Sequence, residues 1–389
     1  MLKDHDLIVV SDDWGRHPFS CQHIVERLLP FNRVLWVNTV GYRPLRLTSY
    51  DARRALGKVC SWIRPQMARE FNSSRPSNIR VLDPIFLPFG THAAIRAFNA
   101  RSVSRSVRDA SLSWNFQHPL LITTLPTAAD FVGRLGEIRA VYYCVDDYNL
   151  WPGEDGALMR ELEERLLRRV DLVVATSGKL QRTRSNGRRS TILLTHGVDL
   201  QHFKAVGTVS PATDIRNLVH PVVGYYGLVD ERCDLQLIAS LAHSLPHITF
   251  LVIGPWKVPQ TPLAGLSNVK IVGKVDYAQL PAYLAPVDLL ILPYHINQLA
   301  EAINPLKLKE YLATGLPVVS TPLPEVVKLH TFLKVAYNAN EFRQAVIAGL
   351  GHGKSYSVEL EYFLQGETWE AKAEVLSNMV QELLTDAVN

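Results

Sequence analysis

A strand–helix–strand unit between residues 287 and 321 most constrains the fold of this chain. Val287–Tyr294 is a largely apolar run of strand length, interrupted only by Asp288, as in strands buried on both faces. A helix with a charged first turn follows from Pro305, and Gly315 ends it before the apolar strand Val318–Ser320. The free N–H groups at the start of such a helix form a natural anion site. We therefore expect an α/β domain with a phosphate site at residues 304–310.

Two charged side chains of this helix suit a nucleotide. Lys307 adds a positive charge in the first turn, and Glu310 follows three residues later on roughly the same face. A diphosphate can bind the cation and the backbone amides, while a ribose hydroxyl binds the carboxylate. The predicted ligand of this unit is therefore a nucleotide.

Strand and helix patterns alternate through all 389 residues, a length that suits two domains. Several strands are apolar throughout, which indicates parallel sheets covered on both faces. The predicted strands are Leu7–Val10, Arg33–Asn38, Ile79–Leu82, Leu120–Thr124, Ala140–Val145, Leu172–Thr176 and Thr191–Leu194, then Val222–Tyr226, Thr249–Ile253, Val269–Val272, Leu289–Leu292 and Val318–Ser320. The pattern predicts two doubly wound domains.

Turn residues at about 203–220 separate the two halves. We place one domain at residues 1–203 and a second at 204–368. Residues 369–389 are expected to form an amphipathic helix that packs back on the first domain. Ligands of open α/β sheets bind at the carboxyl ends of the strands, so the two domains are expected to face a central cleft.

Composition and cysteine placement exclude several protein classes. The 47% hydrophobic and 20% charged content is that of a globular protein, and no apolar run reaches membrane-spanning length. The N-terminus leads directly into a strand and lacks a signal-peptide pattern. The cysteines (Cys21, Cys60, Cys144 and Cys233) have no metal-ligand spacing, so we expect no zinc and a reduced, cytoplasmic setting.

Strand ends in the first half carry further candidate residues. Gly15 permits a tight approach after the first strand, and Arg16 offers an anion donor; the alternative is an ordinary turn. His23, one turn into the next helix, is either catalytic or a packing residue. Asp146 and Asp147 end a buried strand and face opposite ways, so one can reach a ligand while the other, or both, cap the next helix.

Gly227 and Arg232 are the candidates at the start of the second domain. Gly227 ends the strand Val222–Tyr226, and Arg232 precedes a helix start, where an anion docks. The alternative for Arg232 is a surface ion pair with Glu231 or Asp234.

These segments together resemble GT-B-type glycosyltransferases of the group 1, or family four, class, which includes bacterial cell-surface polysaccharide enzymes. The most specific part is Asn304–Val319, supported by Tyr225–Gly227 with Arg232 and by His196–Asp199. The resemblance covers most of residues 5–325.

The resemblance implies two Rossmann-like domains, with a nucleotide-sugar donor, UDP- or GDP-linked, on the C-terminal one and a saccharide or lipid-linked acceptor on the N-terminal one. It implies transfer without a metal or other cofactor, usually with retention at the anomeric carbon. Glu310 would contact the ribose, and Arg232 and Lys307 would neutralise the diphosphate leaving group. The predicted donor site comprises Gly15, Arg16, Gly227, Arg232, Asn304, Pro305, Leu306, Lys307 and Glu310, and the catalytic candidates are Asp146, Asp147 and His23.

One position departs from the family pattern. Many relatives carry a glutamate eight residues before the equivalent of Glu310, where this chain has Ala302, with Glu301 one residue away. Either a shift of the loop restores the carboxylate, or this chain handles the sugar differently.

Positive charge is concentrated in the first half. Residues 1–200 carry 28 basic and 20 acidic side chains, and residues 41–108 alone carry 13 and 3. Part of this excess recurs at helical spacing, at Arg96, Arg101, Arg105 and Arg108. It indicates either an anionic membrane surface as partner, on the inner face of the plasma membrane, or a solvated basic face. No nucleic-acid motif accompanies it, so no nucleic acid is expected.

Two other functions fit the same fold class. A sugar-nucleotide epimerase would bind the same donor without an acceptor. A non-catalytic basic binding protein would retain the fold without using Glu310 or Lys307.

Overall fold

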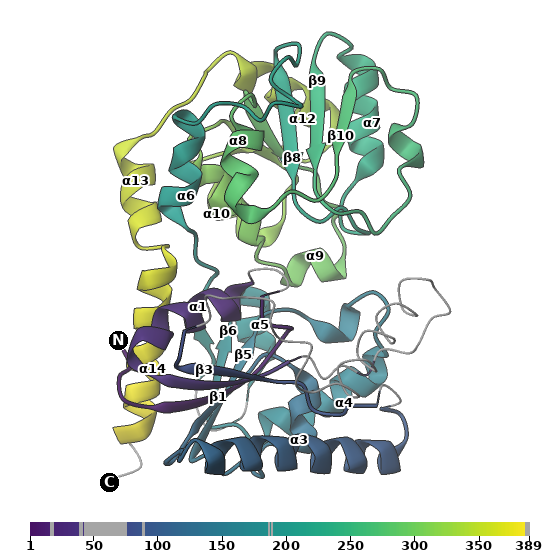
Figure 1. Cartoon of the computed structure of the whole chain (residues 1–389). Coiled ribbons are helices and arrows are strands. Elements are labelled where there is room, and N and C mark those ends of the chain that lie inside the picture. The colour runs from purple at the N-terminus through teal and green to yellow at the C-terminus, as the bar shows by residue number, and fades with distance from the viewer. Residues whose placement is uncertain are drawn as a thin grey trace. The chain divides into compact units, whose positions relative to one another are not determined.

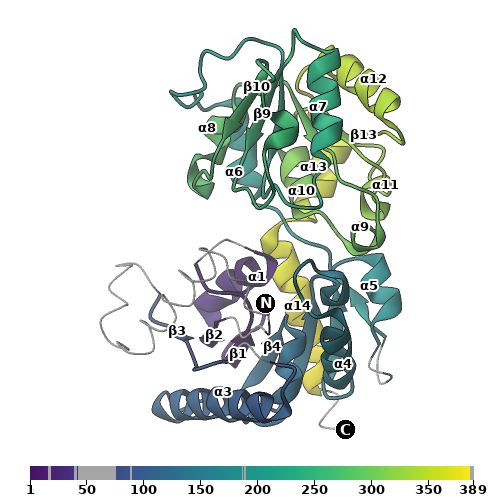
Figure 2. The same ribbon diagram turned by 90° about the vertical axis from the view of Figure 1, so that its right-hand side faces the viewer.

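The computed structural model describes residues 1–15, 19–38, 42, 76–87, 90–185, 187 and 190–385. The chain divides into two compact units, Met1–Thr195 with Lys372–Asn389, and His196–Ala371. Each unit has its own parallel sheet with helices, seen from two sides in Figures 1 and 2. The predicted α/β class with two doubly wound domains is confirmed.

The first unit is built on a seven-stranded sheet in the order β3-β2-β1-β4-β5-β6-β7, in which all neighbours are parallel. The strands are β1 (Asp6–Val10), β2 (Arg33–Val37), β3 (Ile79–Leu82), β4 (Leu120–Thr123), β5 (Arg139–Cys144), β6 (Leu172–Ala175) and β7 (Ile192–Leu193). The order reverses between β1 and β4, so the ends of these strands form a switch point of the kind at which α/β proteins bind ligands.

Helices connect these strands and cover the sheet. They are α1 (Ser20–Leu28), η1 (Leu29–Phe31), α3 (Ala93–Ser113), η2 (Pro126–Asp130), η3 (Tyr148–Leu150), α4 (Gly156–Leu167) and α5 (Gly178–Thr183). The C-terminal helix α14 (Trp369–Thr385) joins them from Lys372 onward and lies beside α1 in both views (Figures 1 and 2). Its buried side chains recur every three or four residues, the pattern of an amphipathic helix: Ala373, Leu376, Val380 and Leu383.

The second unit has a six-stranded parallel sheet in the order β10-β9-β8-β11-β12-β13, and the order reverses between β8 and β11. The strands are β8 (Val222–Tyr226), β9 (Thr249–Ile253), β10 (Val269–Val272), β11 (Leu289–Leu292), β12 (Val318–Ser320) and β13 (Lys334–Val335). The helices are α6 (Leu200–Lys204), η4 (Ala205–Gly207), α7 (Leu235–Ser244), η5 (Thr261–Leu263), η6 (Tyr277–Gln279), α8 (Leu280–Leu284), α9 (Gln298–Ala302), α10 (Leu306–Ala313), α11 (Pro324–Val327), α12 (Ala339–Leu350) and α13 (Val358–Gln365).

The division between the units lies ahead of the boundary expected at residue 203. Phe203 is fully buried in the core of the second unit, so α6 belongs to that unit. Just before α6, Val198 donates its N–H to the carbonyl of Glu367 at 2.9 Å and pairs with Thr368. The second unit thus fastens its first and last segments to each other.

The basic segment 41–108 is described in part. Tyr42, residues 76–87 and residues 90–108 are described, and the rest lies outside the described residues. Of the predicted arginine stripe, Arg96 is turned inward beside Asp130 and Glu161, whereas the other three arginines are exposed on α3. None of the described helices is both long and apolar enough to span a membrane.

Candidate functional site

The end of β8 and the start of α10 meet at Gly227. Its φ of +132° is a conformation that side chains with a Cβ rarely adopt, and its N–H donates to the carbonyl of Ile253 at 2.9 Å. A Cβ at this position would lie 2.2 Å from Nζ of Lys307 and 2.5 Å from its Cε. The glycine thus leaves the space that the lysine side chain occupies.

Lys307 is held by neutral aromatic groups. Its ammonium donates to the phenol oxygen of Tyr225 at 2.8 Å and lies 4.5 Å from the centre of that ring. The ring of Tyr294, just after β11, lies 5.3 Å away. Among the described residues, no salt bridge involves Lys307. Its positive charge is therefore positioned without being neutralised.

Glu310 lies one turn further along α10 and is 7% exposed. The phenol of Tyr226 donates a hydrogen bond to its Oε2. Burial, and then the negative charge of Glu310, raise the pKa of Tyr226 well above its usual value, so this phenol stays a donor. The hydroxyl of Tyr311 accepts from the N–H of Tyr226 at 3.0 Å and donates to its carbonyl at 2.9 Å. Strand β8 and helix α10 are therefore joined at the charged residues.

The start of α10 suits an anion. Its N-cap residue is Pro305, whose side chain cannot cap the first N–H groups, and Leu306 is the first helical residue. Asn304 precedes them and is buried. The four consecutive residues Asn304 to Lys307 thus bring backbone N–H groups and one ammonium to the same helix end.

Arg232 lies near the ring of Tyr294, as Lys307 does, but it already has a carboxylate partner. Its guanidinium binds Asp230, with Nη2 to Oδ2 at 2.7 Å and Nε to Oδ1 at 2.9 Å. This carboxylate differs from the two that the sequence suggested, Glu231 and Asp234. Burial favours the neutral form of Asp230, but the hydrogen bonds and charge of Arg232, with the charge of Lys307, hold its pKa below the usual value.

A cavity of about 380 Å³ opens beside this pair in the second unit. It is lined by Asp230, Glu231, Cys233, Leu235, Gln236, Val258, Pro259, Thr261, Pro262 and His295. Arg232 lies 5.9 Å from the ring of Tyr294, the ring that also lies under Lys307. Two cations therefore converge on one aromatic ring next to a cavity.

Helix α9 contains Ala302, the position that departs from the family pattern, and its neighbour Glu301. Ala302 is 1% exposed, whereas Glu301 is exposed. The carboxylate of Glu301 thus does not take the buried position of Ala302.

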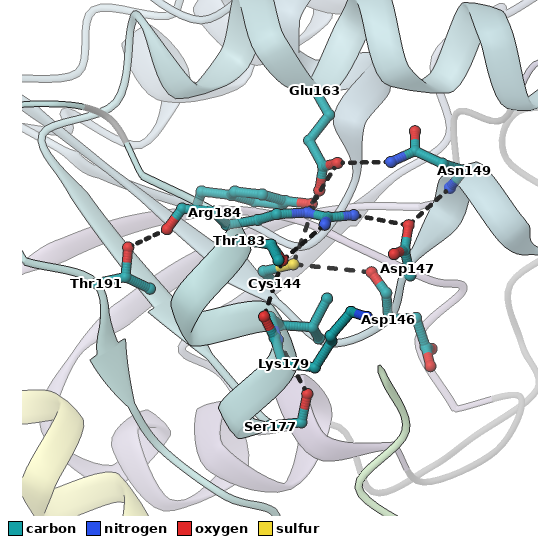
Figure 3. A network of polar contacts seen from close by, with 12 residues as sticks. Cys144, Asp146, Asp147, Asn149, Glu163, Ser177, Lys179, Thr183, Arg184 and Thr191 are labelled. Carbon is teal, nitrogen blue, oxygen red and sulfur yellow. Dashed lines mark hydrogen bonds and ion pairs between the residues drawn. The ribbon is translucent and has the colours of Figure 1, made fainter. Parts of the chain in front are cut away.

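In the first unit, Asp147 belongs to a buried ion-pair network (Figure 3). Its carboxylate binds Arg184 at 2.6 Å and caps η3 by accepting from the N–H of Asn149. Arg184 also lies 3.1 Å from Glu163, which accepts from the phenol of Tyr142 at 2.7 Å. The predicted capping role of this aspartate is thus present, and its charge is balanced inside the protein.

Asp146 differs from its neighbour. It is half-buried, and its carbonyl oxygen, rather than its carboxylate, accepts from the Cys144 thiol at 3.7 Å (Figure 3). Burial, and then the charges of Asp12 and Asp146, raise the pKa of Tyr148. The Asp146 carboxylate therefore lies in the same electrostatic neighbourhood as Asp12, which follows β1.

Gly15 and His23 belong to one chain of polar contacts that runs through Gln22 and Glu26. His23 Nδ1 lies 3.6 Å from the Glu26 carboxylate, and Gln22 donates to the same carboxylate at 2.9 Å. The N–H of Gly15 donates to the Gln22 side chain at 3.1 Å, so this amide is engaged within the protein. Arg16 lies outside the described residues. The structure thus connects Gly15 to His23 only through Gln22 and Glu26, and it places Gly227 directly against Lys307 in the other unit.

Comparison with known proteins finds similarity to one family in the second unit. Residues 220–352 match the family model described as "Glycosyl transferases group 1". The chain is 29% identical over 180 residues to the Bacillus subtilis (strain 168) protein named "Putative teichuronic acid biosynthesis glycosyltransferase TuaH". That match covers 44% of this chain and 45% of the relative, so the chain spans less than half of that relative's length.

Solved structures share the fold over nearly the whole chain. Sucrose-phosphate synthase from Thermosynechococcus elongatus superposes with a TM-score of 0.70 at 14% identity, covering 98% of this chain and 100% of that one. An Anabaena protein in complex with UDP and glucose superposes with a TM-score of 0.58 at 14% identity. That match covers 98% of this chain and 100% of the Anabaena chain. The structure titled "Trehalose-6-phosphate from E. coli bound with UDP-2-fluoro glucose" superposes with a TM-score of 0.65 at 14% identity. That match covers 97% of this chain and 98% of the other chain. Identities this low show the fold alone.

Proposed function

We propose that the whole chain transfers a sugar from a nucleoside-diphosphate sugar to an acceptor hydroxyl, because residues 220–352 match the group 1 glycosyltransferase model. The single observation that carries the proposal is the geometry of α10. Lys307, held by neutral phenol groups, stands at an uncapped helix start, and Glu310 follows one turn later.

This geometry suits departure of a nucleoside diphosphate. As the bond to the sugar breaks, negative charge builds on the diphosphate, and preorganised donors stabilise that charge. Lys307 and the first amides of α10 supply such donors, and Arg232 adds a partly neutralised cation. Glu310 accepts from ribose hydroxyls. In this proposal the fixed cations neutralise the leaving group without a metal, and retention at the anomeric carbon follows the family resemblance.

We assign the acceptor to the first unit, with Asp146 as the carboxylate that contacts the acceptor hydroxyl. Asp147 is less suited because Arg184 already binds it. The relative named for teichuronic acid biosynthesis supports a saccharide or lipid-linked acceptor in cell-surface polysaccharide synthesis. The Anabaena protein holding UDP supports a UDP-linked donor, with GDP as the other candidate.

A lipid-linked acceptor would suit an enzyme at the inner face of the plasma membrane, and α3 offers a matching surface. Exposed side chains recur every three or four residues along one side of this helix, namely Phe98, Arg101, Arg105, Arg108 and Leu112. Each arginine near an anionic surface contributes about 1 kcal/mol, so we propose a weak, reversible membrane contact. Cosedimentation with anionic vesicles should be lost when the three arginines become glutamine.

A thermal-shift screen with UDP, GDP and ADP in EDTA tests the proposal. A ligand at a hundred times its Kd adds about 2.7 kcal/mol, or roughly 5 °C or more for a unit of this size. No shift with any of them, from a folded protein, would contradict nucleotide binding. Incubation with labelled donor and acceptor should then give a glycosylated acceptor, whereas an epimerised donor without transfer would overturn the assignment.

A further inference from the structure

We infer that Tyr225 and Tyr226 position two different parts of the nucleotide, the first acting through Lys307 on the diphosphate and the second through Glu310 on the ribose. The inference rests on the proposed function and extends it to two residues that would not themselves touch the ligand. It follows from which phenol meets which charged group.

The two tyrosines reach different residues because they are neighbours on a strand. Successive side chains of a strand point to opposite faces, so the phenols of β8 diverge. Both are buried, at 1% and 5% exposed. On α10 their partners are three residues apart, so they lie close together but not in line along the helix. One strand end therefore holds one helix at two charged points.

The Tyr225 phenol fixes the ammonium of Lys307. Its proton is donated to the carbonyl of Leu228 at 2.9 Å, which leaves a lone pair to accept from Lys307 at 2.8 Å. Its ring also supports the cation from 4.5 Å away. Since the partner is neutral, the lysine keeps a full charge at a defined place. Loss of this phenol oxygen would free the ammonium to move while leaving its charge unchanged.

The Tyr226 phenol fixes the carboxylate of Glu310. It donates to Oε2, and its own backbone is clasped by the hydroxyl of Tyr311 at 3.0 and 2.9 Å. The donor is therefore as immobile as the strand. A hydrogen bond to a buried charge restricts the carboxylate to one orientation, which is the requirement for accepting from a pair of vicinal hydroxyls.

Matched Phe variants test the assignment when the binding of the whole nucleotide is compared with the binding of its nucleoside and diphosphate parts. The probes are UDP, uridine and inorganic pyrophosphate, with GDP and guanosine replacing the first two if GDP is the nucleotide that stabilises the wild type. We expect Tyr225→Phe to lower the affinity for UDP and for pyrophosphate about five- to tenfold. The affinity for uridine should not change. Tyr226→Phe should lower the affinity for UDP and for uridine by a similar factor and leave the affinity for pyrophosphate unchanged. In steady-state assays Tyr225→Phe should lower kcat, whereas Tyr226→Phe should raise the donor KM.

Tyr283→Phe is the control, because it removes a phenol oxygen of the same unit that binds Asp214 and not α10. It should leave all three affinities unchanged. If Tyr226→Phe fails to fold, Glu310→Gln replaces it, and the same selective loss of uridine is expected. Equal losses of all probes in both Phe variants, or no loss in either, would overturn the inference. Failure of the wild type to bind any nucleotide would instead remove the proposed function, and the inference with it.

Discussion

Two clusters of charged side chains, one in each unit, are built on opposite principles. In the first unit Arg184 binds the carboxylates of Asp147 and Glu163, so buried charges cancel each other. In the second unit neutral phenols hold Lys307 and Glu310. Removing one partner of a buried ion pair leaves an uncompensated charge and destabilises the fold, whereas a cation held by a neutral phenol, as Lys307 is, can bind an anionic ligand. We therefore interpret the first cluster as structural and propose the second as the nucleotide site.

The largest effect should come from breaking the cluster in the first unit. Arg184→Met leaves two buried carboxylates without their cation, which should cost about 3–5 kcal/mol of unfolding free energy. Urea unfolding measures it, and the affinity for UDP of the protein that remains folded should not change. Wild-type stability in this variant would show that the ion pairs contribute nothing.

Lys307→Met should do the reverse. It removes a cation that stabilises the negative charge developing on the diphosphate, so kcat/KM should fall roughly 10²- to 10³-fold. The melting temperature should stay near that of the wild type. Lys309 provides a matched control in the same helix, because it is buried and paired with Glu367. Lys309→Met should lower stability by several kcal/mol. If the two variants lost activity and stability alike, the distinction between paired and available charge would be wrong.

Arg232→Gln should have an intermediate effect. Since Asp230 already neutralises part of this charge, we expect UDP affinity to fall about five- to tenfold, or roughly 1 kcal/mol, less than for Lys307→Met. Calorimetric titration of both variants at one ionic strength gives the ranking. A larger loss for Arg232→Gln would make the arginine the main diphosphate contact.

The smallest effect concerns pH. The folded-state pKa of Asp230 lies below its ordinary value of 3.8, so its contribution to stability is present above that pH and is lost as the pH falls through the folded-state pKa. The stability difference between the wild type and Asp230→Asn should therefore be constant from pH 7 to about 5 and shrink below about 4. Unfolding curves across this range measure it, and a difference that grows in acid would contradict the ion pair.

The strands could be predicted from sequence because each is a short apolar run. All twelve predicted strands are present in the structure, whereas β13 was missed because it has only two residues, one of them charged. Helix α12 has no apolar stripe from which it could be predicted, because Phe342 and Val346 are its only buried residues.

The site was only partly predictable, for a physical reason. The anion site proposed at α10 could be predicted from local sequence, since Pro305, Lys307 and Glu310 are close in the chain. The groups that hold them are not, because Tyr225 lies 82 residues before Lys307 and Tyr226 lies 84 before Glu310. Packing of the sheet, rather than any local pattern, brings them together. In the sequence, Tyr225 and Tyr226 supported only the family resemblance, and no local pattern linked them to α10.

The most decisive measurement is calorimetric titration of UDP and GDP into the wild type and Lys307→Met, in EDTA. We expect one of the two nucleotides to bind the wild type in a one-to-one ratio, and to bind Lys307→Met at least tenfold more weakly. Equal affinity for both proteins, or no binding to a folded wild type, would contradict a nucleotide site on α10.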